Sequence, residues 1–272
     1  MSRSQAAVPQ TVVIAGGLGT RLGALTAGRP KILVPVQGHP LLDWVMAFLR
    51  DQHVTSVHLC LGHLADQVLA HLARRDYGPM RITTSVERTP VGTAGCLRLA
   101  ERYLEEEFLL LLGDTYTPLD LARLTREWRG SESAAAMVVL RNRDRLVPSN
   151  VHADAGRVLR YDKSAGPGEL EYVDFGIALL RKHVLRRLPA EGFLDLGVLF
   201  DSLIQGGELA ALETTSRFYE IGSPAGHAEL SRLAERGEIR FPGPPALARP
   251  SLPVGERSPV GDRGEEEHDR TR

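Results

Sequence analysis

The stretch TVVIAGGLGTRLGALTAGRPKILVPV, residues 11–36, decides the fold because a short apolar segment runs directly into a glycine-rich loop. Residues 12–15 are all apolar, as in a strand that is buried on both faces of a parallel sheet. Gly16, Gly17 and Gly19 follow at the point where α/β folds bind ligands, beyond the carboxyl end of a strand. Glycine lets backbone N–H groups approach phosphate oxygens without a Cβ atom in the way. The stretch therefore predicts a strand followed by an anion-binding loop.

The loop matches neither of two common phosphate-binding motifs. The dinucleotide pattern GxGxxG would place its third glycine at position 22, which is Leu22, and the P-loop pattern GxxxxGK[ST] is absent. What remains is GGLGTRL, with Arg21 inside it and Pro30-Lys31 further along the chain. On the loop alone, a glycine turn followed by surface cations is an alternative interpretation.

The wider pattern indicates an α/β fold, because short apolar segments alternate with longer segments of helical spacing. Strands are expected at 12–15, 57–61, 80–84, 108–113 and 134–140, and helices at 41–51, 64–74, 94–105 and 119–128. A mixed lobe with strands near 149–153, 157–162 and 171–180 and helices near 195–205 and 225–236 continues the same domain. We predict a Rossmann-like, doubly wound mixed sheet, mostly parallel and flanked by helices, in one catalytic domain over residues 1–240. Residues 241–272 have almost no large apolar side chains and predict a disordered tail.

Composition excludes several classes of partner. Lys and Arg number 33 against 34 Asp and Glu, so the chain has no overall basic field for nucleic acid or anionic lipid. No stretch approaches the roughly 20 apolar residues of a membrane helix. The two cysteines, Cys60 and Cys96, lack CxxC spacing, and no secretory leader is recognisable ahead of Thr11. We therefore expect a cytoplasmic protein without a disulfide framework or structural zinc site.

The residues around the loop resemble the signature of the sugar-1-phosphate nucleotidylyltransferases, the NDP-sugar pyrophosphorylases. That signature is GGxGTRL, a spacer, then PK, PV, G and P, found here as Gly16 to Leu22, Pro30-Lys31, Pro35-Val36, Gly38 and Pro40. Further segments look like later landmarks of the family, in the right order: VERTPVGTAGCLRLA (86–100), LLLLGDTY (109–116), YDK (161–163) and FYEIGSPAGH (218–227). The resemblance covers about residues 11–236, is closest to heptose and mannose 1-phosphate guanylyltransferases, and implies the nucleotide-diphospho-sugar transferase fold.

The resemblance implies that a phosphate oxygen of a sugar 1-phosphate attacks the α-phosphorus of a nucleoside triphosphate and that pyrophosphate leaves. Two polyanions must meet, so the reaction needs cations in fixed positions. Arg21 would hold the departing β- and γ-phosphates, and Lys31 would lie where charge builds near the α-phosphate. The nucleotide-binding residues implied are Ala15, Gly16, Gly17, Gly19, Thr20, Glu87, Gly92 and Thr93. Those implied for the sugar phosphate are Lys163, Asp174 and Gly176, with Asp174 falling where relatives often carry Asn.

Asp114 and Glu220 are the metal ligands implied, and Mg²⁺ is the expected cofactor. Asp114 follows a buried apolar strand, where a carboxylate needs a cation, and Mg²⁺ binds through one or two carboxylates and the substrate phosphates. Glu220 stands where many relatives carry aspartate. Purely structural roles are the alternatives for three of these residues: a helix N-cap for Asp114, a helix cap for Thr93, and an exposed lysine in a turn for Lys163.

The most favoured function is transfer from GTP to a heptose or hexose 1-phosphate. Thymidylyl, uridylyl, cytidylyl or adenylyl transfer to another sugar or cyclitol phosphate is an alternative, as is a non-catalytic, nucleotide-sugar-binding regulatory relative. The expected partners are a nucleoside triphosphate and a sugar 1-phosphate, with neither nucleic acid nor membrane. The sequence leaves open whether the chain forms a homo-oligomer.

Overall fold

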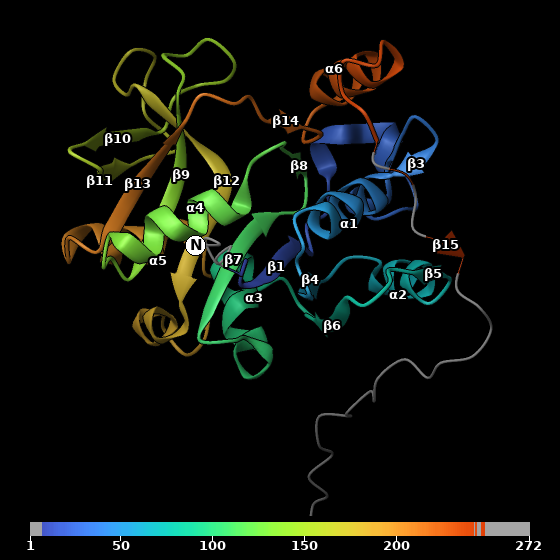
Figure 1. The fold of residues 1–272 in the computed structure, drawn as a ribbon, viewed down its shortest axis with the longest axis horizontal. Helices are drawn as coiled ribbons and strands as arrows, with labels where there is room; N and C mark the ends of the chain where they lie inside the picture. Colours follow the sequence, from blue (N-terminus) through green and yellow to red (C-terminus); the bar gives the residue numbers. More distant parts are fainter. Residues whose placement is uncertain (1–6, 242, 244–245, 248–272) are drawn as a thin grey trace, which may run out of the picture.

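The computed structural model describes residues 7–241, 243 and 246–247, and its centre is a nine-stranded sheet in the order β10-β11-β13-β9-β12-β7-β1-β4-β6 (Figure 1). The strands of this sheet are β1 (Gln10–Ala15), β4 (Ser56–Leu61), β6 (Arg81–Val86), β7 (Glu107–Leu112), β9 (Ala135–Arg141), β10 (Val151–Asp154), β11 (Arg157–Tyr161), β12 (Tyr172–Arg181) and β13 (Leu209–Thr214). Short pairs form from β2 (Pro35–Val36) with β3 (His39–Pro40), β5 (Arg75–Asp76) with β15 (Ala246–Leu247), and β8 (Thr115–Tyr116) with β14 (Tyr219–Glu220). The helices are α1 (Leu41–Asp51), α2 (Ala65–Leu72), α3 (Gly92–Ala100), α4 (Leu121–Gly130), α5 (Leu196–Gln205) and α6 (Pro224–Glu235).

Strands β6, β4, β1 and β7 form a parallel half in which neighbouring strands end at the same edge. Three of them are followed directly by glycine, at Gly16, Gly62 and Gly113. A Cβ on Gly113 would lie 2.6 Å from the carbonyl oxygen of Ile14, so only glycine allows β7 to end this close to β1. This crowded edge is where the glycine loop and Asp114 emerge.

The other half of the sheet corrects the expectation of a mostly parallel arrangement. Strand β12 pairs antiparallel with both β7 and β9, whereas β13 runs parallel to β9. Strand β10 pairs antiparallel with β11 and also with β12, through Val151 and Tyr172, and β11 pairs antiparallel with β13. Strands β10, β11, β13, β9 and β12 therefore close into a ring, and only the α/β class and the mixed sheet are confirmed.

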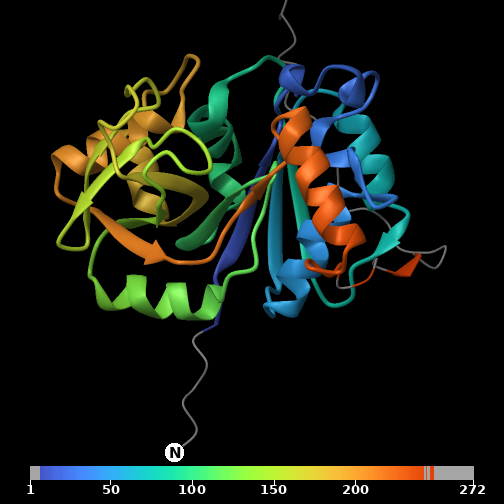
Figure 2. The ribbon, with the colours of Figure 1, turned by 90° about the horizontal axis from the view of Figure 1, so that it is seen from above.

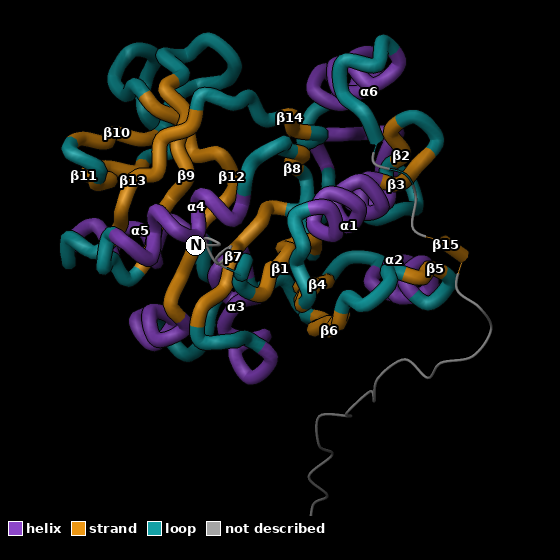
Figure 3. Tube along the Cα trace, viewed as in Figure 1, coloured by secondary structure: helices purple, strands orange, loops and turns teal. Residues whose placement is uncertain are grey.

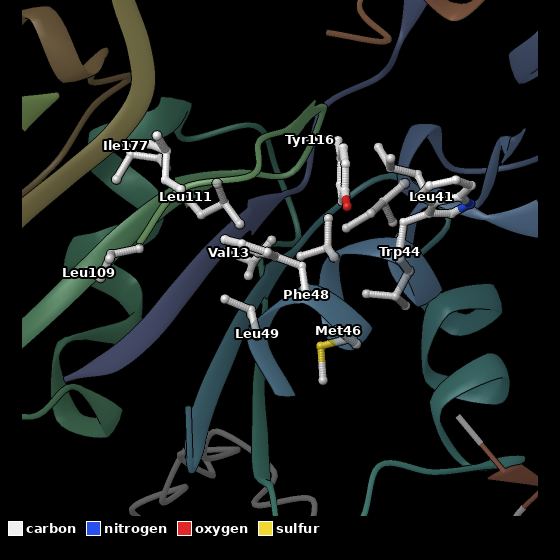
Figure 4. Packing of buried hydrophobic residues seen from close by; sticks show 14 of the residues in the cluster. Val13, Leu41, Trp44, Met46, Phe48, Leu49, Leu109, Leu111, Tyr116 and Ile177 are labelled. Carbon is white, nitrogen blue, oxygen red and sulfur yellow. The ribbon is translucent and has the colours of Figure 1, made fainter. Parts of the chain in front are cut away.

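Helices lie on both faces of the sheet (Figure 3). Successive side chains of a strand point to opposite faces, so apolar side chains on each face need a covering layer. Val13, Leu109 and Leu111 pack on one side with Trp44 and Phe48 of α1 (Figure 4). The neighbouring positions Val12, Phe108 and Leu110 pack on the other side with side chains of α3 and α5. Burial on both faces explains why these strands are apolar without interruption.

The segment from β13 to α6 crosses from the ring of strands to the parallel half (Figure 2). Strand β13 pairs in the ring, β14 pairs with β8 directly after β7, and α6 packs near β2 and the 3-10 segment Thr20–Thr26. The chain therefore returns to the glycine loop late in the sequence. This crossing brings the segment around Glu220 to the edge of the parallel half.

Most of the expected elements are present within a few residues of their expected bounds, but β13 was missed. Its sequence, LAALET, contains two alanines and a glutamate, which have low strand propensity, and it is a strand because it lies between β9 and β11. The expected tail at 241–272 lies mainly outside the described residues. Within it, the Phe241 ring lies 4.7 Å from that of Trp44. No helix in the part of the chain that the structure describes has the length and apolar character needed to cross a bilayer.

Candidate active site

The glycine loop leaves β1 and is held open by its own backbone geometry. Gly19 has a φ of 66°, in the left-handed region, and a Cβ there would lie 2.9 Å from Cγ2 of Thr26. The Thr26 hydroxyl donates to the carbonyl oxygens of Gly19 and Gly23, both at 3.1 Å. Gly17 is exposed, and a Cβ on it would meet nothing within 4 Å. The loop therefore offers backbone to solvent beside the strand end, as an anion site requires.

Four charged side chains converge beside the loop around Gly222. A methyl group on Gly222 would lie 2.2 Å from Oε2 of Glu220, 3.1 Å from Nη2 of Arg21 and 3.3 Å from Nζ of Lys31. Lys31 Nζ in turn donates to Oδ2 of Asp114 at 2.5 Å. The structure thus brings together Arg21, Lys31, Asp114 and Glu220, although the four residues come from three distant parts of the chain.

The short β8–β14 ladder joins the two carboxylates of this cluster. Thr115 pairs with Glu220, and the backbone N–H of Ile221 donates to the carbonyl oxygen of Asp114 at 2.8 Å. Asp114 lies in the turn between β7 and β8, so it does not cap a helix as the alternative interpretation proposed.

The donor set of Asp114 and Glu220 fits a hard divalent cation. Besides Lys31, Asp114 accepts from the hydroxyl of Thr115 at 3.3 Å, and Glu220 accepts from Ser223 Oγ and Gly222 N, both at 3.1 Å. An ionised carboxylate has about four lone-pair sites, so each keeps acceptor capacity. Across the described residues, no three His, Cys, Asp or Glu side chains lie where they could jointly hold a metal ion. A two-carboxylate site suits Mg²⁺, which completes its octahedron with water and phosphate oxygens.

Glu87 and two glycines form the neighbouring wall, at the ends of β6, β1 and β4. A Cβ on Gly16 would lie 2.9 Å from Oε1 of Glu87, and one on Gly62 would lie 2.6 Å from the same oxygen. Burial raises the pKa of Glu87, while the N–H of Val91, which donates to Oε2 at 3.3 Å, lowers it by less. Glu87 therefore packs against the first glycine of the loop.

Gly92 and Thr93 begin α3 next to this wall. Gly92 has a φ of 82°, and a Cβ there would lie 2.3 Å from the carbonyl oxygen of Leu194. The alternative interpretation, in which Thr93 caps its own helix, is wrong: its Oγ1 accepts from the N–H of Leu196, the first residue of α5. Thr93 thus fastens α5 to the start of α3.

Lys163 follows β11 and is paired with Asp195. Its Nζ donates to Oδ1 of Asp195 at 2.9 Å and to Oδ2 at 3.1 Å. Asp195 also caps α5 by accepting from Gly197 N at 2.9 Å, and accepts from the Thr93 hydroxyl at 3.4 Å. Burial alone would raise the pKa of Asp195, but the bonds from Gly197 and Lys163 outweigh it and lower that pKa. The lysine is half exposed, as the turn interpretation expected, yet fixed in place.

Asp174 lies on β12 directly before an irregularity in the β9–β12 pairing. Asp174 pairs with Val139, and Ala178 pairs with Met137. Between these two pairs, residues 175–177 of β12 lie opposite the single residue 138 of β9. Gly176, with a φ of 78°, makes this bulge, and a Cβ on it would lie 3.3 Å from Oγ1 of Thr115. The bulge therefore brings β12 against Thr115, the residue that follows Asp114.

The structure thus places the predicted residues in two groups that share one edge of the sheet. Ala15 ends β1, and Thr20 is exposed at the start of the 3-10 segment that carries Arg21. Sequence reasoning missed Gly62, Asp195 and Gly222 as site residues. A signal for Gly62 was available, because it follows an apolar strand as Gly16 and Gly113 do. Asp195 carried no comparable signal, since an aspartate before a helix is an ordinary N-cap.

The fold resembles that of solved structures. The crystal structure of HddC from Yersinia pseudotuberculosis superposes with a TM-score of 0.72 at 24% identity, covering 82% of this chain and 98% of that chain. A second structure of HddC is complexed with GMP-PN. The inositol-1-phosphate CTP transferase from T. maritima gives a TM-score of 0.69 at 22% identity, covering 85% of this chain and 97% of that one. These likenesses show the shared α/β fold.

The chain belongs to the nucleotidyl transferase family, whose model matches residues 10–149. It is 34% identical, over 80% of its length, to the CMP-5'-(3-aminopropyl)phosphonate synthase of Streptomyces rubellomurinus, and spans 38% of that protein. It is 29% identical, over 42% of its length, to the D-glycero-alpha-D-manno-heptose 1-phosphate guanylyltransferase of Campylobacter jejuni, and spans 52% of that protein.

Proposed function

We propose that this chain joins a nucleoside triphosphate to an acceptor phosphate, giving a nucleotide-activated product and pyrophosphate. The observation that carries the proposal is the convergence of Arg21, Lys31 and Glu220 on Gly222, with Asp114 paired to Lys31. Cations and carboxylates in fixed positions beside a glycine loop are what the meeting of two polyanions needs.

Within this proposal, the backbone N–H groups of the loop receive the triphosphate, and Arg21 holds the phosphates that depart. Lys31 stabilises the charge that builds at the α-phosphorus, and Lys163, held by Asp195, binds the acceptor phosphate. Asp114 and Glu220 would hold Mg²⁺, which supplies positive charge to the phosphates when bound. Glu87, Gly92 and Thr93 line the side on which the base lies.

The acceptor favoured by the sequence is a heptose or hexose 1-phosphate, with GTP as donor. The heptose 1-phosphate guanylyltransferase relative supports that pairing. The aminopropylphosphonate relative, with the higher identity, favours a second candidate: cytidylyl transfer to a phosphonate. Both reactions use the same attack by an acceptor oxygen on the α-phosphorus.

The test is pyrophosphate release from each nucleoside triphosphate with a panel of sugar 1-phosphates and phosphonates, with Mg²⁺ and with excess chelator. With the best pair, Lys31→Ala should lower kcat about a hundredfold or more, by analogy with loss of one stabilising donor, and Asp114→Ala should do so because the proposed metal ligand is lost. The matched controls are Lys182→Ala and Asp154→Ala. Lys182 donates to the carbonyl oxygen of Leu104, near the opposite end of β7, and Asp154 is exposed on β10. Full turnover in either site variant, both being folded, would contradict the proposal.

A further inference from the structure

Asp174 is a partly buried carboxylate whose hydrogen bonds come from neutral groups. The N–H of Gly176 donates to Oδ1 at 2.9 Å, and the hydroxyl of Tyr161 donates to Oδ2 at 3.3 Å. In the part of the chain that the structure describes, no side-chain nitrogen of Lys, Arg or His lies within 4.0 Å of the Asp174 carboxylate oxygens, the distance that defines an ion pair. Its charge is therefore unmatched at short range.

The nearby cation is already engaged. Lys163 gives two hydrogen bonds to Asp195, so when ionised the three groups Asp174, Asp195 and Lys163 carry one net negative charge. Burial raises the pKa of Asp174, which means that the surroundings disfavour its charged form until a cation arrives. Lys163 therefore balances only one of these two carboxylates.

Asp174 also lies between the Asp114 cluster and the strand that leads to Lys163. The bulge at Gly176 brings β12 against Thr115, the residue after Asp114, and Tyr161 connects Asp174 to the strand that leads to Lys163. A group bound at Asp174 is therefore close to both the acceptor-phosphate lysine and the Asp114 cluster.

We propose that Asp174 recognises an ammonium group on the acceptor, so that the substrate class is an aminoalkyl phosphate or phosphonate. A desolvated carboxylate gains more from an ammonium group than from a sugar hydroxyl, because the ammonium group both donates hydrogen bonds and neutralises the charge. This inference rests on the proposed nucleotidyl transfer. In it, an oxygen of the phosphate or phosphonate forms a bond to the α-phosphorus, and the bond from that phosphorus to the bridging oxygen breaks. Pyrophosphate leaves with the electron pair, and the ammonium group is unchanged.

The test compares two acceptors that differ only by the terminal ammonium group, 3-aminopropylphosphonate and propylphosphonate, with the best nucleoside triphosphate. The wild-type protein should prefer the amine by about 30-fold in kcat/KM, the difference between a charge-assisted and an absent interaction. Asp174→Asn, which is isosteric, should reduce that ratio to about threefold or less, and Asp174→Glu should retain most of it. The control variant Asp154→Asn should keep the wild-type ratio.

The outcomes separate this inference from the proposed function. Turnover of a sugar 1-phosphate without any preference for the amine would overturn the role of Asp174 and leave nucleotidyl transfer standing. A wild-type preference that Asp174→Asn retains would also overturn it. Absence of pyrophosphate release with every donor and acceptor would overturn both. Should Asp174→Asn fail to fold, as judged by thermal melting, loss of the amine preference in a folded Asp174→Glu protein would count against the assignment.

Discussion

The substitution Gly222→Ala probes the candidate site without removing any of its charged groups. The added methyl would lie 2.2 Å from Oε2 of Glu220, a distance that real Cβ atoms do not adopt, and within 3.3 Å of nitrogens of Arg21 and Lys31. Gly222 is absent from the residues with positive φ, so its backbone accepts alanine. The perturbation is therefore confined to the positions of the three charged side chains.

Stability and activity should respond differently to this change. Replacing glycine with alanine at a compatible backbone position stabilises the folded protein by about 0.4–1 kcal/mol, because alanine lowers the conformational entropy of the unfolded chain. Loss of the hydrogen bond from Gly222 N to Glu220, at 3.1 Å, costs about 1 kcal/mol, so the free energy of unfolding should change by less than about 1 kcal/mol. Displacing catalytic groups by about 1 Å costs on the order of a hundredfold in rate, or about 2.7 kcal/mol of barrier.

The assay is pyrophosphate release by Gly222→Ala alongside thermal melting, with Gly130→Ala as the matched control. Gly130 ends α4, and a Cβ there would meet nothing within 4 Å. Its alanine variant should keep wild-type kcat/KM and gain slightly in stability from helix propensity. Wild-type kcat/KM in a folded Gly222→Ala protein would refute the idea that these three side chains act as one site.

Three further substitutions test separate parts of the site. Gly17→Ala should leave the melting temperature unchanged, because its Cβ would meet nothing within 4 Å. It should raise the KM for the nucleoside triphosphate about tenfold, because the methyl group blocks the approach of phosphate to the backbone. An unchanged KM would count against the loop as the phosphate site. Glu87→Gln should stabilise the fold at neutral pH, because burial raises the pKa of Glu87 and its ionised form therefore costs stability as pH rises above its unfolded pKa. The gain, followed by chemical denaturation, should vanish at a pH below the unfolded pKa of glutamate, and a gain that persists there would contradict the explanation. Asp195→Asn should keep the N-cap of α5 but remove the ion pair with Lys163. The KM for the acceptor should rise about tenfold, with little change in the KM for the nucleotide. Equal effects on both KM values would indicate a merely structural role.

The local features of the site follow from sequence because they depend on neighbours in the chain. Glycines directly after apolar strands predicted the crowded edge at Gly16, and the position of Asp114 after a buried strand predicted a carboxylate at that edge. The family resemblance implied a role for Lys31 at the site, and the structure pairs it with Asp114 at 2.5 Å. In each case the backbone within a few residues determines where the side chain lies.

The features that sequence did not reveal depend on distant pairing. Strand β13 has a composition typical of a helix, but its backbone pairing with β9 holds it in the extended conformation. The ring closed by the pairing of Val151 with Tyr172 depends on where β10 turns, which no local pattern specifies. The pairing of Lys163 with Asp195 joins residues 32 apart in sequence.

Charge balance in the cluster links its geometry to the need for a divalent cation. Arg21 and Lys31 carry two positive charges and Asp114 and Glu220 carry two negative ones, so when all are ionised the four side chains have no net charge. Lys31 and Asp114 neutralise each other directly at 2.5 Å. An approaching triphosphate would draw Lys31 toward its oxygens and leave Asp114 unpaired, a costly state for a carboxylate that is three-quarters buried. In the proposed site, Asp114 would hold a divalent cation that accompanies the phosphates, and the positive charge of that cation would offset this cost. In the proposed site, joint binding of nucleotide and Mg²⁺ would therefore leave both Lys31 and Asp114 with a partner, whereas either ligand alone would leave one of them without a partner.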